Sequence, residues 1–286
     1  MPLASSASAS ARASFSPAAS CTSVELFEQV QPRSLLLLAS VSAVSGERVA
    51  SAAAAVGSAY GEAAVMATAG STYVASYNSE WVCSDSGCGG WWCGFARDSS
   101  CTFSEVSAIL AYDVDGATGT LERRAAGAVP GYLLSQWAMS EHEGHLRVAY
   151  TKRSCGDWRG DGPCTDNRVD VLRASDLALP SEASRVAGLG LGETIYAVRF
   201  EGPLAFVVTF RRTDPLYTLD LADPLAPRVL GELKITGYSD YLHLLSPTTL
   251  LGVGREATEG GRLLGIKLAL FNVTDLAHPT EVRYRE

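Results

Sequence analysis

Positive charge is scarce in this sequence. The chain of 286 residues has 23 Lys and Arg against 31 Asp and Glu, a net charge of −8, and the charged residues are scattered. A nucleic-acid-binding surface needs clustered positive charge, so the sequence argues against nucleic acid as a partner. Long apolar runs are also missing, since the longest, Ser34–Val44, is about half of the ~20 residues that a membrane-spanning helix needs. We therefore expect no transmembrane segment.

Signatures of known catalytic sites are absent as well. The sequence contains no Gly-rich phosphate loop, no GxSxG motif and no spacing that supports a Ser/His/Asp triad. No stretch has a convincing amphipathic period of 3.6 residues, which disfavours helix. The hydrophobic content of 47% nevertheless suffices for a sizeable buried core. These features together predict an all-β chain without a cofactor.

Cysteine usage indicates the compartment. Six of the seven cysteines lie in two short stretches rich in Gly, Ser and Asp, where reduced structural cysteines, which prefer burial, would be poorly placed: Cys83, Cys88, Cys93, Cys101, Cys155 and Cys164. Disulfides in an oxidising compartment explain this placement better than zinc, because the CxxC spacing of zinc sites is missing. We expect one bridge between Cys155 and Cys164 and two among the other four, whose pairing the sequence leaves open.

The N-terminal segment differs from the rest. Seven Ala and seven Ser fall within the first twenty residues, and residues 1–22 are expected to be a disordered leader. Cys21 follows Ala18-Ala19-Ser20, as in a lipoprotein processing site, but no apolar segment precedes it. The role of this cysteine stays open.

Repeated strand pairs organise the remainder of the chain. Each first strand alternates apolar and polar residues, and a second run rich in Val, Leu, Ile and Tyr follows it. The pairs are Thr72–Asn78 with Ser107–Val114, His145–Thr151 with Asn167–Ala174, Leu204–Phe210 with Asp214–Leu221, and Thr249–Arg255 with Ile266–Val273. Once the unequal connections within the pairs are discounted, the units repeat every ~42–45 residues, as propeller blades do.

Each unit also contains a turn and two further strands. An Asp begins each turn, at Asp115, Asp176, Asp223 and Asp275, and in three of the four a Pro follows. Asp accepts bonds from backbone N–H groups two residues on, and Pro ends strand pairing. With one strand before each pair and one after each turn, every unit is a four-stranded meander. The sequence therefore predicts a β-propeller of about four blades plus a partial one, in an open or incomplete ring.

Several segments resemble a known family: Glu193–Phe200, Asp214–Leu221, Val229–Ile235 and Gly237–His243. They are similar to bacterial and archaeal secreted proteins with a C-terminal β-propeller distantly related to WD repeats. The resemblance implies export and brings no catalytic mechanism. It covers Gly188–Glu286 closely and reaches back more weakly to about Ser34. Since the chain ends directly after an outer strand and shows no export signal, we expect a fragment or a naturally short version.

The predicted domain boundaries follow the repeats. The propeller is expected over residues 23–286, with a partial blade at 23–45 and blades at about 58–125, 130–187, 192–235 and 237–286. In a four-stranded meander, the connections between the second and third strands all emerge at one end. The long insertions should therefore share one face.

Tryptophans mark that face as a candidate binding surface. Four of the five lie in or beside the Cys-rich insertions, at Trp81, Trp91, Trp92 and Trp158. Tryptophan is enriched at binding hot spots, which favours a contact role. Alternatively, these indoles form miniature cores for disulfide-linked loops.

Two polar positions invite a functional interpretation on the innermost strands. Tyr238 and Asp240 lie where alternate side chains can line the central channel. Asp240 could instead hydrogen-bond between blades as a structural residue. His142, His145, Glu141 and Glu143 surround Gly144, which favours a solvated turn over a metal site. No metal site is predicted.

Together these patterns predict an exported protein, secreted, periplasmic or on the cell surface. It would act as a binding or scaffolding module through its Cys- and Trp-rich loop face, with a protein or a surface polysaccharide as partner. The alternative is a secreted hydrolase or lyase with acidic residues, including Asp240, at the channel mouth.

Overall fold

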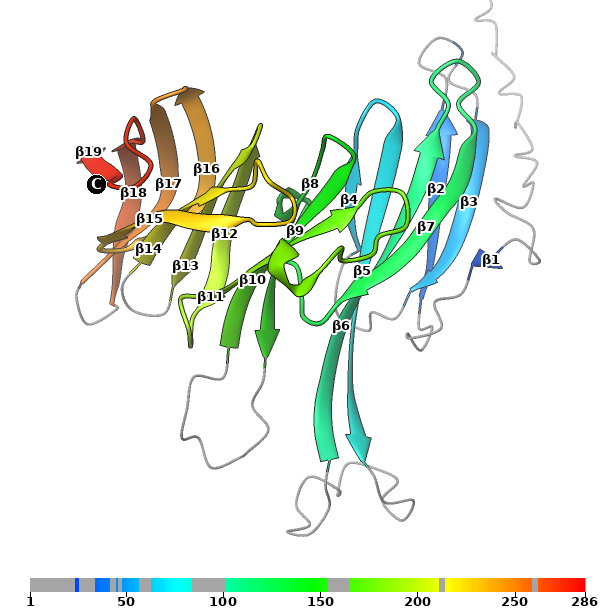
Figure 1. The fold of residues 1–286 in the computed structure, drawn as a ribbon, viewed down its shortest axis with the longest axis horizontal. Helices are drawn as coiled ribbons and strands as arrows, with labels where there is room; N and C mark the ends of the chain where they lie inside the picture. The colour runs from blue at the N-terminus through cyan, green and yellow to red at the C-terminus, as the bar shows by residue number, and fades with distance from the viewer. Residues whose placement is uncertain are drawn as a thin grey trace, which may run out of the picture.

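The strands of the described chain form five successive sheets (Figure 1). The computed structural model describes residues 24–25, 34–41, 45, 48–56, 63–83, 101–153, 165–210, 214–258 and 262–285. The N-terminal sheet contains β1 (Val24–Glu25), β2 (Ser34–Val41) and β3 (Arg48–Val56). Blade 1 contains β4 (Ala64–Ala67), β5 (Ser71–Cys83), β6 (Cys101–Val114) and β7 (Leu121–Val129).

The other three sheets repeat the same four-stranded plan. Blade 2 contains β8 (Met139–His142), β9 (His145–Arg153), β10 (Thr165–Arg173) and β11 (Arg185–Leu189). Blade 3 contains β12 (Thr194–Glu201), β13 (Leu204–Phe210), β14 (Asp214–Asp220) and β15 (Arg228–Ile235). Blade 4 contains β16 (Tyr238–Ser246), β17 (Thr249–Ala257), β18 (Leu263–Asn272) and β19 (Thr280–Arg285). Each predicted strand pair is the central pair of one blade, and the propeller-type fold is confirmed.

The middle strands of the blades are buried on both faces because neighbouring blades cover both. Strand β9 shows this clearly, with a continuous buried stretch from Leu146 to Thr151. All neighbouring strands within blades 1 to 4 pair antiparallel. Among the described residues, the helical segments are two short 3₁₀ turns, η3 (Gln136–Ala138) and η4 (Glu182–Ser184). None of the described helices is long and apolar enough to span a membrane.

The aspartates predicted to shape the turns do so in all four blades. A carboxylate oxygen of Asp115, Asp176, Asp223 or Asp275 accepts a bond from the backbone N–H two residues later, at 2.8–3.0 Å. In Asp115, these backbone bonds hold the pKa of the carboxyl below its usual value, because they favour its charged form. Each aspartate therefore fixes the path of the chain between the third and fourth strands.

Four hydrophobic cores lie between neighbouring sheets. One lies between the N-terminal sheet and blade 1, and the next three lie between blades 1 and 2, 2 and 3, and 3 and 4. Phe206 of β13 and Phe271 of β18, for example, meet in the last of these cores. Each sheet is thus stabilised by the sheets beside it, as expected for blades.

The N-terminal sheet extends beyond the partial blade expected at residues 23–45. Strand β3, which the sequence did not predict, pairs antiparallel with β2 and parallel with the two residues of β1. Its sequence is rich in alanine, which is depleted in strands because it lacks the branched or aromatic side chain that packs on a pleated surface. Tertiary pairing with the leucines of β2 therefore outweighs a weak local preference.

The sheets form an open arc, with the N-terminal sheet and blade 4 at opposite ends (Figure 1). Blade 4 has no neighbouring sheet beyond it in the described chain. The face of blade 4 that points away from blade 3, its outer face, accordingly exposes Leu264, Ile266, Leu268 and Val282. The prediction of an open ring agrees with this arrangement.

Candidate functional site

The first strands of three blades line a groove of about 360 Å³ on the inner side of the arc. Its walls come from β4, the segment η3–β8, and β12. The lining combines apolar side chains with polar ones, the latter including Thr68, Gln136, Ser140, Glu141 and Arg199. Thr68 Oγ1 donates to Glu141 Oε2 at 3.3 Å and so connects blade 1 with blade 2 across the groove wall.

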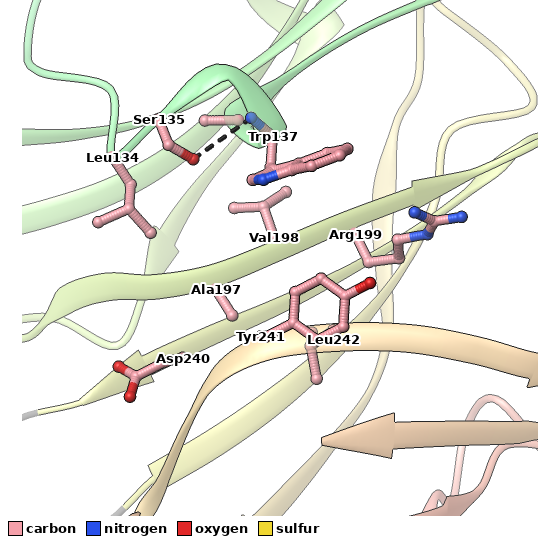
Figure 2. A pocket seen from close by; sticks show the side chains of 10 residues that line it. Leu134, Ser135, Trp137, Ala197, Val198, Arg199, Asp240, Tyr241 and Leu242 are labelled. Atoms are coloured by element: carbon pink, nitrogen blue, oxygen red, sulfur yellow. Dashed lines mark hydrogen bonds between the residues drawn. The ribbon is translucent and has the colours of Figure 1, made fainter. Parts of the chain in front are cut away.

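A smaller pocket of about 30 Å³ adjoins this groove between η3, β12 and β16 (Figure 2). Trp137 and Arg199 line both hollows. Trp137 comes from the blade 2 side of β12 and Tyr241 from the blade 4 side (Figure 2). Trp137 is 56% exposed and Tyr241 is 45% exposed, so two aromatic residues face solvent here.

A helix cap holds Trp137 in its exposed position. Ser135 precedes η3, and its Oγ accepts a bond from the Trp137 backbone N–H at 3.3 Å. The next residue, Ala138, is buried in the core between blades 2 and 3. Because Ala138 anchors the turn, the neighbouring indole projects outward.

The buried Arg147 side chain lies beneath the groove and contacts residues that line it. Its guanidinium donates to the Gly202 carbonyl and to Ser140 Oγ, and it lies 5.0 Å from the centre of the Phe200 ring. Burial lowers the pKa of Arg147 to about 10, because desolvation disfavours the charged form. Ser140 and Phe200 both line the groove, so this arginine joins blade 2 to blade 3 beneath it.

Charged groups of both signs reach the hollows. Arg199 Nη2 donates to Glu201 Oε2 at 2.8 Å, while the buried Arg199 Nε has no hydrogen-bond partner among the described residues. Burial raises the pKa of the Asp240 carboxyl, an effect that the charge of Arg255 partly offsets. The two hollows thus offer two aromatic surfaces, the guanidinium of Arg199 and the carboxylates of Glu141 and Asp240.

Comparison with known proteins identifies the family. The chain matches the family described as "Beta propeller domain" over residues 2–286. It belongs to this β-propeller family. The chain is also 43% identical to an uncharacterised protein of Archaeoglobus fulgidus over 162 residues, which are 56% of this chain and 23% of that protein. An uncharacterised protein of Methanocaldococcus jannaschii is 46% identical over 157 residues, 55% of this chain and 23% of its own length. The match therefore spans about a quarter of each of these archaeal relatives.

Of the two inner-strand residues predicted for binding, the propeller places one beside the pocket. Asp240 lines it and is exposed (Figure 2). No hydrogen bond of its carboxylate connects blades among the described residues. Tyr238 instead packs against Tyr196 and Phe210, with ring centres 4.6 and 4.7 Å apart, within the contact between blades 3 and 4.

The predicted loop residues fall largely outside the described part of the propeller. This holds for Cys21, Cys88, Cys93, Cys155, Cys164, Trp91, Trp92 and Trp158. Trp81 and Cys83 lie on β5 and Cys101 on β6, near the ends of these strands. The central strand pairs of blades 1 and 2 end at the same edge of the propeller (Figure 1), so both Cys-rich insertions leave from that edge.

A polar network connects the two blades at the base of these insertions. Tyr77 donates to Glu105 Oε1 at 2.5 Å, and Arg153 Nη1 lies 3.3 Å from the same oxygen. Arg153 also lies over the Tyr132 ring, 4.9 Å from its centre. Burial and the bond to Glu105 raise the pKa of Tyr77 to about 12. The buried Glu105 carboxylate is thus held by partners from blades 1 and 2.

Tyr77 should make the propeller sensitive to alkali. The unfolded side chain ionises near pH 10 and the folded one near pH 12, so the folded state retains its proton in this range. Its contribution to stability is present below pH 10 and is lost as the pH rises from 10 to 12. Urea unfolding across this range should therefore show a shallower decline for Tyr77→Phe than for the unchanged protein. Equal slopes would contradict the assignment.

The His and Glu residues around Gly144 form a tight turn, as expected. Glu143 and Gly144 have φ values of 47° and 75°, which match a two-residue hairpin between β8 and β9. Within the described ranges, no group of three or more His, Cys, Asp or Glu side chains could hold a metal ion. The turn interpretation of this segment is confirmed.

Sequence reasoning missed Trp137 and Arg199. Trp137 is the one tryptophan outside the Cys-rich stretches, and nothing in its neighbourhood resembled a binding motif. Its signal was the Ser135 cap followed by an apolar residue that the short turn cannot bury along with Ala138. Arg199 looked like an ordinary polar residue of an alternating strand.

Proposed function

We propose that this propeller is a binding module whose inner groove and adjoining pocket contact the partner through Trp137 and Tyr241. The exposed indole of Trp137 carries the proposal. A capped turn holds the indole beside an apolar pocket, and large rigid aromatic side chains of this kind dominate the energetics of binding interfaces. Tyr241, Arg199 and Asp240 supply a second aromatic surface and polar groups around it.

The proposed partner is a protein or a surface polysaccharide. Aromatic surfaces suit both, whereas the net charge of −8 disfavours polyanions. The Cys- and Trp-rich insertions, with Trp81, Trp91, Trp92 and Trp158, would add a second contact surface at one edge of the propeller. A scaffolding role through this loop face belongs to the same proposal.

Export to the cell exterior, the periplasm or the cell surface is also part of the proposal. The clustering of six cysteines in Gly-, Ser- and Asp-rich stretches supports it, because disulfides persist in oxidising compartments. The resemblance to secreted propellers distantly related to WD repeats supports it as well. Fractionation of cells that produce the full-length natural protein tests export directly, and recovery from the cytosol alone would contradict it.

Replacing Trp137 by Ala should abolish most of the binding. Protein with ¹⁵N-labelled indoles would be titrated with soluble glucose, N-acetylglucosamine and uronic acid hexaoses and with a panel of synthetic peptides. We expect one class of probe to shift the Trp137 indole signal, which Trp137→Phe identifies by its disappearance. Trp137→Ala should reduce the affinity for that probe by about tenfold or more, since hot-spot aromatic residues contribute ~2 kcal/mol each.

The exposed Leu134, which lines the same pocket, supplies a comparison for this experiment. Leu134→Ala should reduce affinity much less than Trp137→Ala, because the smaller side chain offers less contact surface. Circular dichroism should show that both variants keep the β fold. A Trp137 signal that responds to neither class of probe would contradict the inner groove as the binding site.

A second candidate is a secreted hydrolase or lyase that uses Asp240 as an acid. The raised pKa of Asp240 favours it, because a carboxyl that keeps its proton longer can donate it. Among the residues that line the pocket, however, Asp240 is the one carboxylate, whereas glycoside hydrolysis commonly uses a pair. Product analysis of the hexaose titrations tests this candidate, and unchanged hexaoses would contradict activity on those sugars.

A further inference from the structure

The central hairpin of blade 1 extends well beyond its own sheet. Strands β5 and β6 pair continuously from Ser71 opposite Asp113 to Cys83 opposite Cys101. Strand β4, however, supports β5 no further than Ala75, and β7 supports β6 only from Ser107 onward. Residues 79–83 and 101–105 therefore form a ribbon of two strands that projects from the propeller (Figure 1).

Such a ribbon needs additional stabilisation. A two-stranded hairpin is marginally stable in water, because it buries little apolar surface. The network around Glu105 holds the base of the ribbon, where Tyr77 and Arg153 contact this carboxylate. This network lies at the opposite end of the ribbon from Cys83 and Cys101, the last paired residues. The far end of the ribbon is thus where a covalent link would contribute most.

The strand register puts two cysteines at that end. Residues directly opposite each other in an antiparallel pair have Cα atoms about 4.5 or 5.5 Å apart and share one face of the sheet. Disulfides are formed between residues with Cα separations of about 4.4–6.8 Å. Cys83 and Cys101 are opposite partners, so either type of pairing brings them within this range.

We propose that Cys83 and Cys101 form a disulfide that closes the projecting ribbon. The two thiols lose two protons and two electrons as the S–S bond forms, and a disulfide oxidant accepts them and becomes two thiols. In the cell the proposal rests on the proposed export, since an oxidising compartment supplies that oxidant. Of the three pairings that the sequence leaves open, this is the one in which Cys88 pairs with Cys93.

Peptide mapping of the unreduced protein tests the pairing independently of export. The purified full chain is oxidised with glutathione disulfide, alkylated and digested with trypsin and with a protease that cleaves before Asp. Cleavage before Asp85 separates Cys83 from Cys88, and cleavage at Arg97 and Asp98 separates Cys93 from Cys101. We expect the peptide ending at Ser84 to be linked to the peptide that begins at Asp98.

Other outcomes of the mapping overturn the pairing. These are a link from Cys83 to the peptide 85–97, alkylation of both Cys83 and Cys101, or zinc bound by the four thiols. Protein that is reduced inside cells but forms the expected link with glutathione disulfide would support the pairing and contradict export. The two proposals therefore fail separately.

Matched variants add a second measurement. Compared with the unchanged protein, Cys83→Ser should add one alkylated thiol, at Cys101, whereas Cys88→Ser should add one at Cys93 and keep the link between Cys83 and Cys101. A free Cys88 or Cys93 thiol in the Cys83→Ser protein would overturn the proposal. Because both variants change a position of the same hairpin and its connection, any general effect of removing a cysteine appears in both.

Discussion

Replacing Arg185 by Ala should lower the free energy of unfolding by about 3–5 kcal/mol, the cost typical of removing one partner from a buried ion pair. Arg185 Nε and Nη2 donate to the two oxygens of the buried Asp170 at 2.7 and 2.8 Å. Without the guanidinium, the carboxylate would retain Tyr150, whose hydroxyl lies 3.2 Å from both oxygens and supplies a neutral donor only. Urea unfolding at pH 7 measures the loss.

Arg173 offers a control in the same blade. It also pairs with an aspartate, Asp176 at 2.7 Å, but both side chains are about half exposed. Exposed ion pairs contribute little, because solvent screens the charges and the side chains lose freedom in forming the pair. Arg173→Ala should therefore leave the unfolding free energy nearly unchanged. Equal losses in the two variants would show that burial is not what makes the Arg185 pair important.

Leu250→Ala should destabilise the protein by about 2–5 kcal/mol, the range for large-to-small changes in a packed core. Leu250 is fully buried in the core between blades 3 and 4, together with Phe206 and Phe271. Its truncation removes apolar contacts and leaves a cavity that its neighbours fill only in part. Chemical unfolding followed by circular dichroism measures the change.

Leu268→Ala makes the same chemical change in the same blade on the exposed face. Leu268 is 46% exposed on β18 and takes no part in the core between blades 3 and 4. Its loss should cost well under half of the Leu250 effect. If both variants lost the same stability, the outer face of blade 4 would have to be packed as tightly as its inner face.

The sequence predicted those parts of the fold where local chemistry and tertiary packing agree. The β9 segment alternates and is rich in β-branched and aromatic residues, and Asp223 and Asp275 carry the side chains that their turns require. Strand β3 was missed because alanines give no strand signal, and only pairing with β2 makes it a strand. Prediction therefore failed where long-range pairing decides the structure.

The candidate site was less predictable than the fold. Asp240 was expected near the channel because its strand could be assigned and alternation gives its face. Trp137 could not be found in that way, because its exposure depends on a cap, a buried neighbour and the approach of β12 from another blade. Trp137 and Arg199, about sixty positions apart in the sequence, both line the pocket, and no local sequence pattern predicts such a contact.

The placement of the cores between neighbouring sheets determines how the unfolding of one blade affects the others. Because each core is shared by two adjacent sheets, stability is approximately a sum of blade terms and nearest-neighbour interface terms. Blade 2 is held by two such interfaces and blade 4 by one within the described chain. Among the described sheets, unfolding of blade 4 therefore removes one interface and leaves the other sheets packed together. Unfolding of blade 2 removes two interfaces and separates the remaining sheets into two groups.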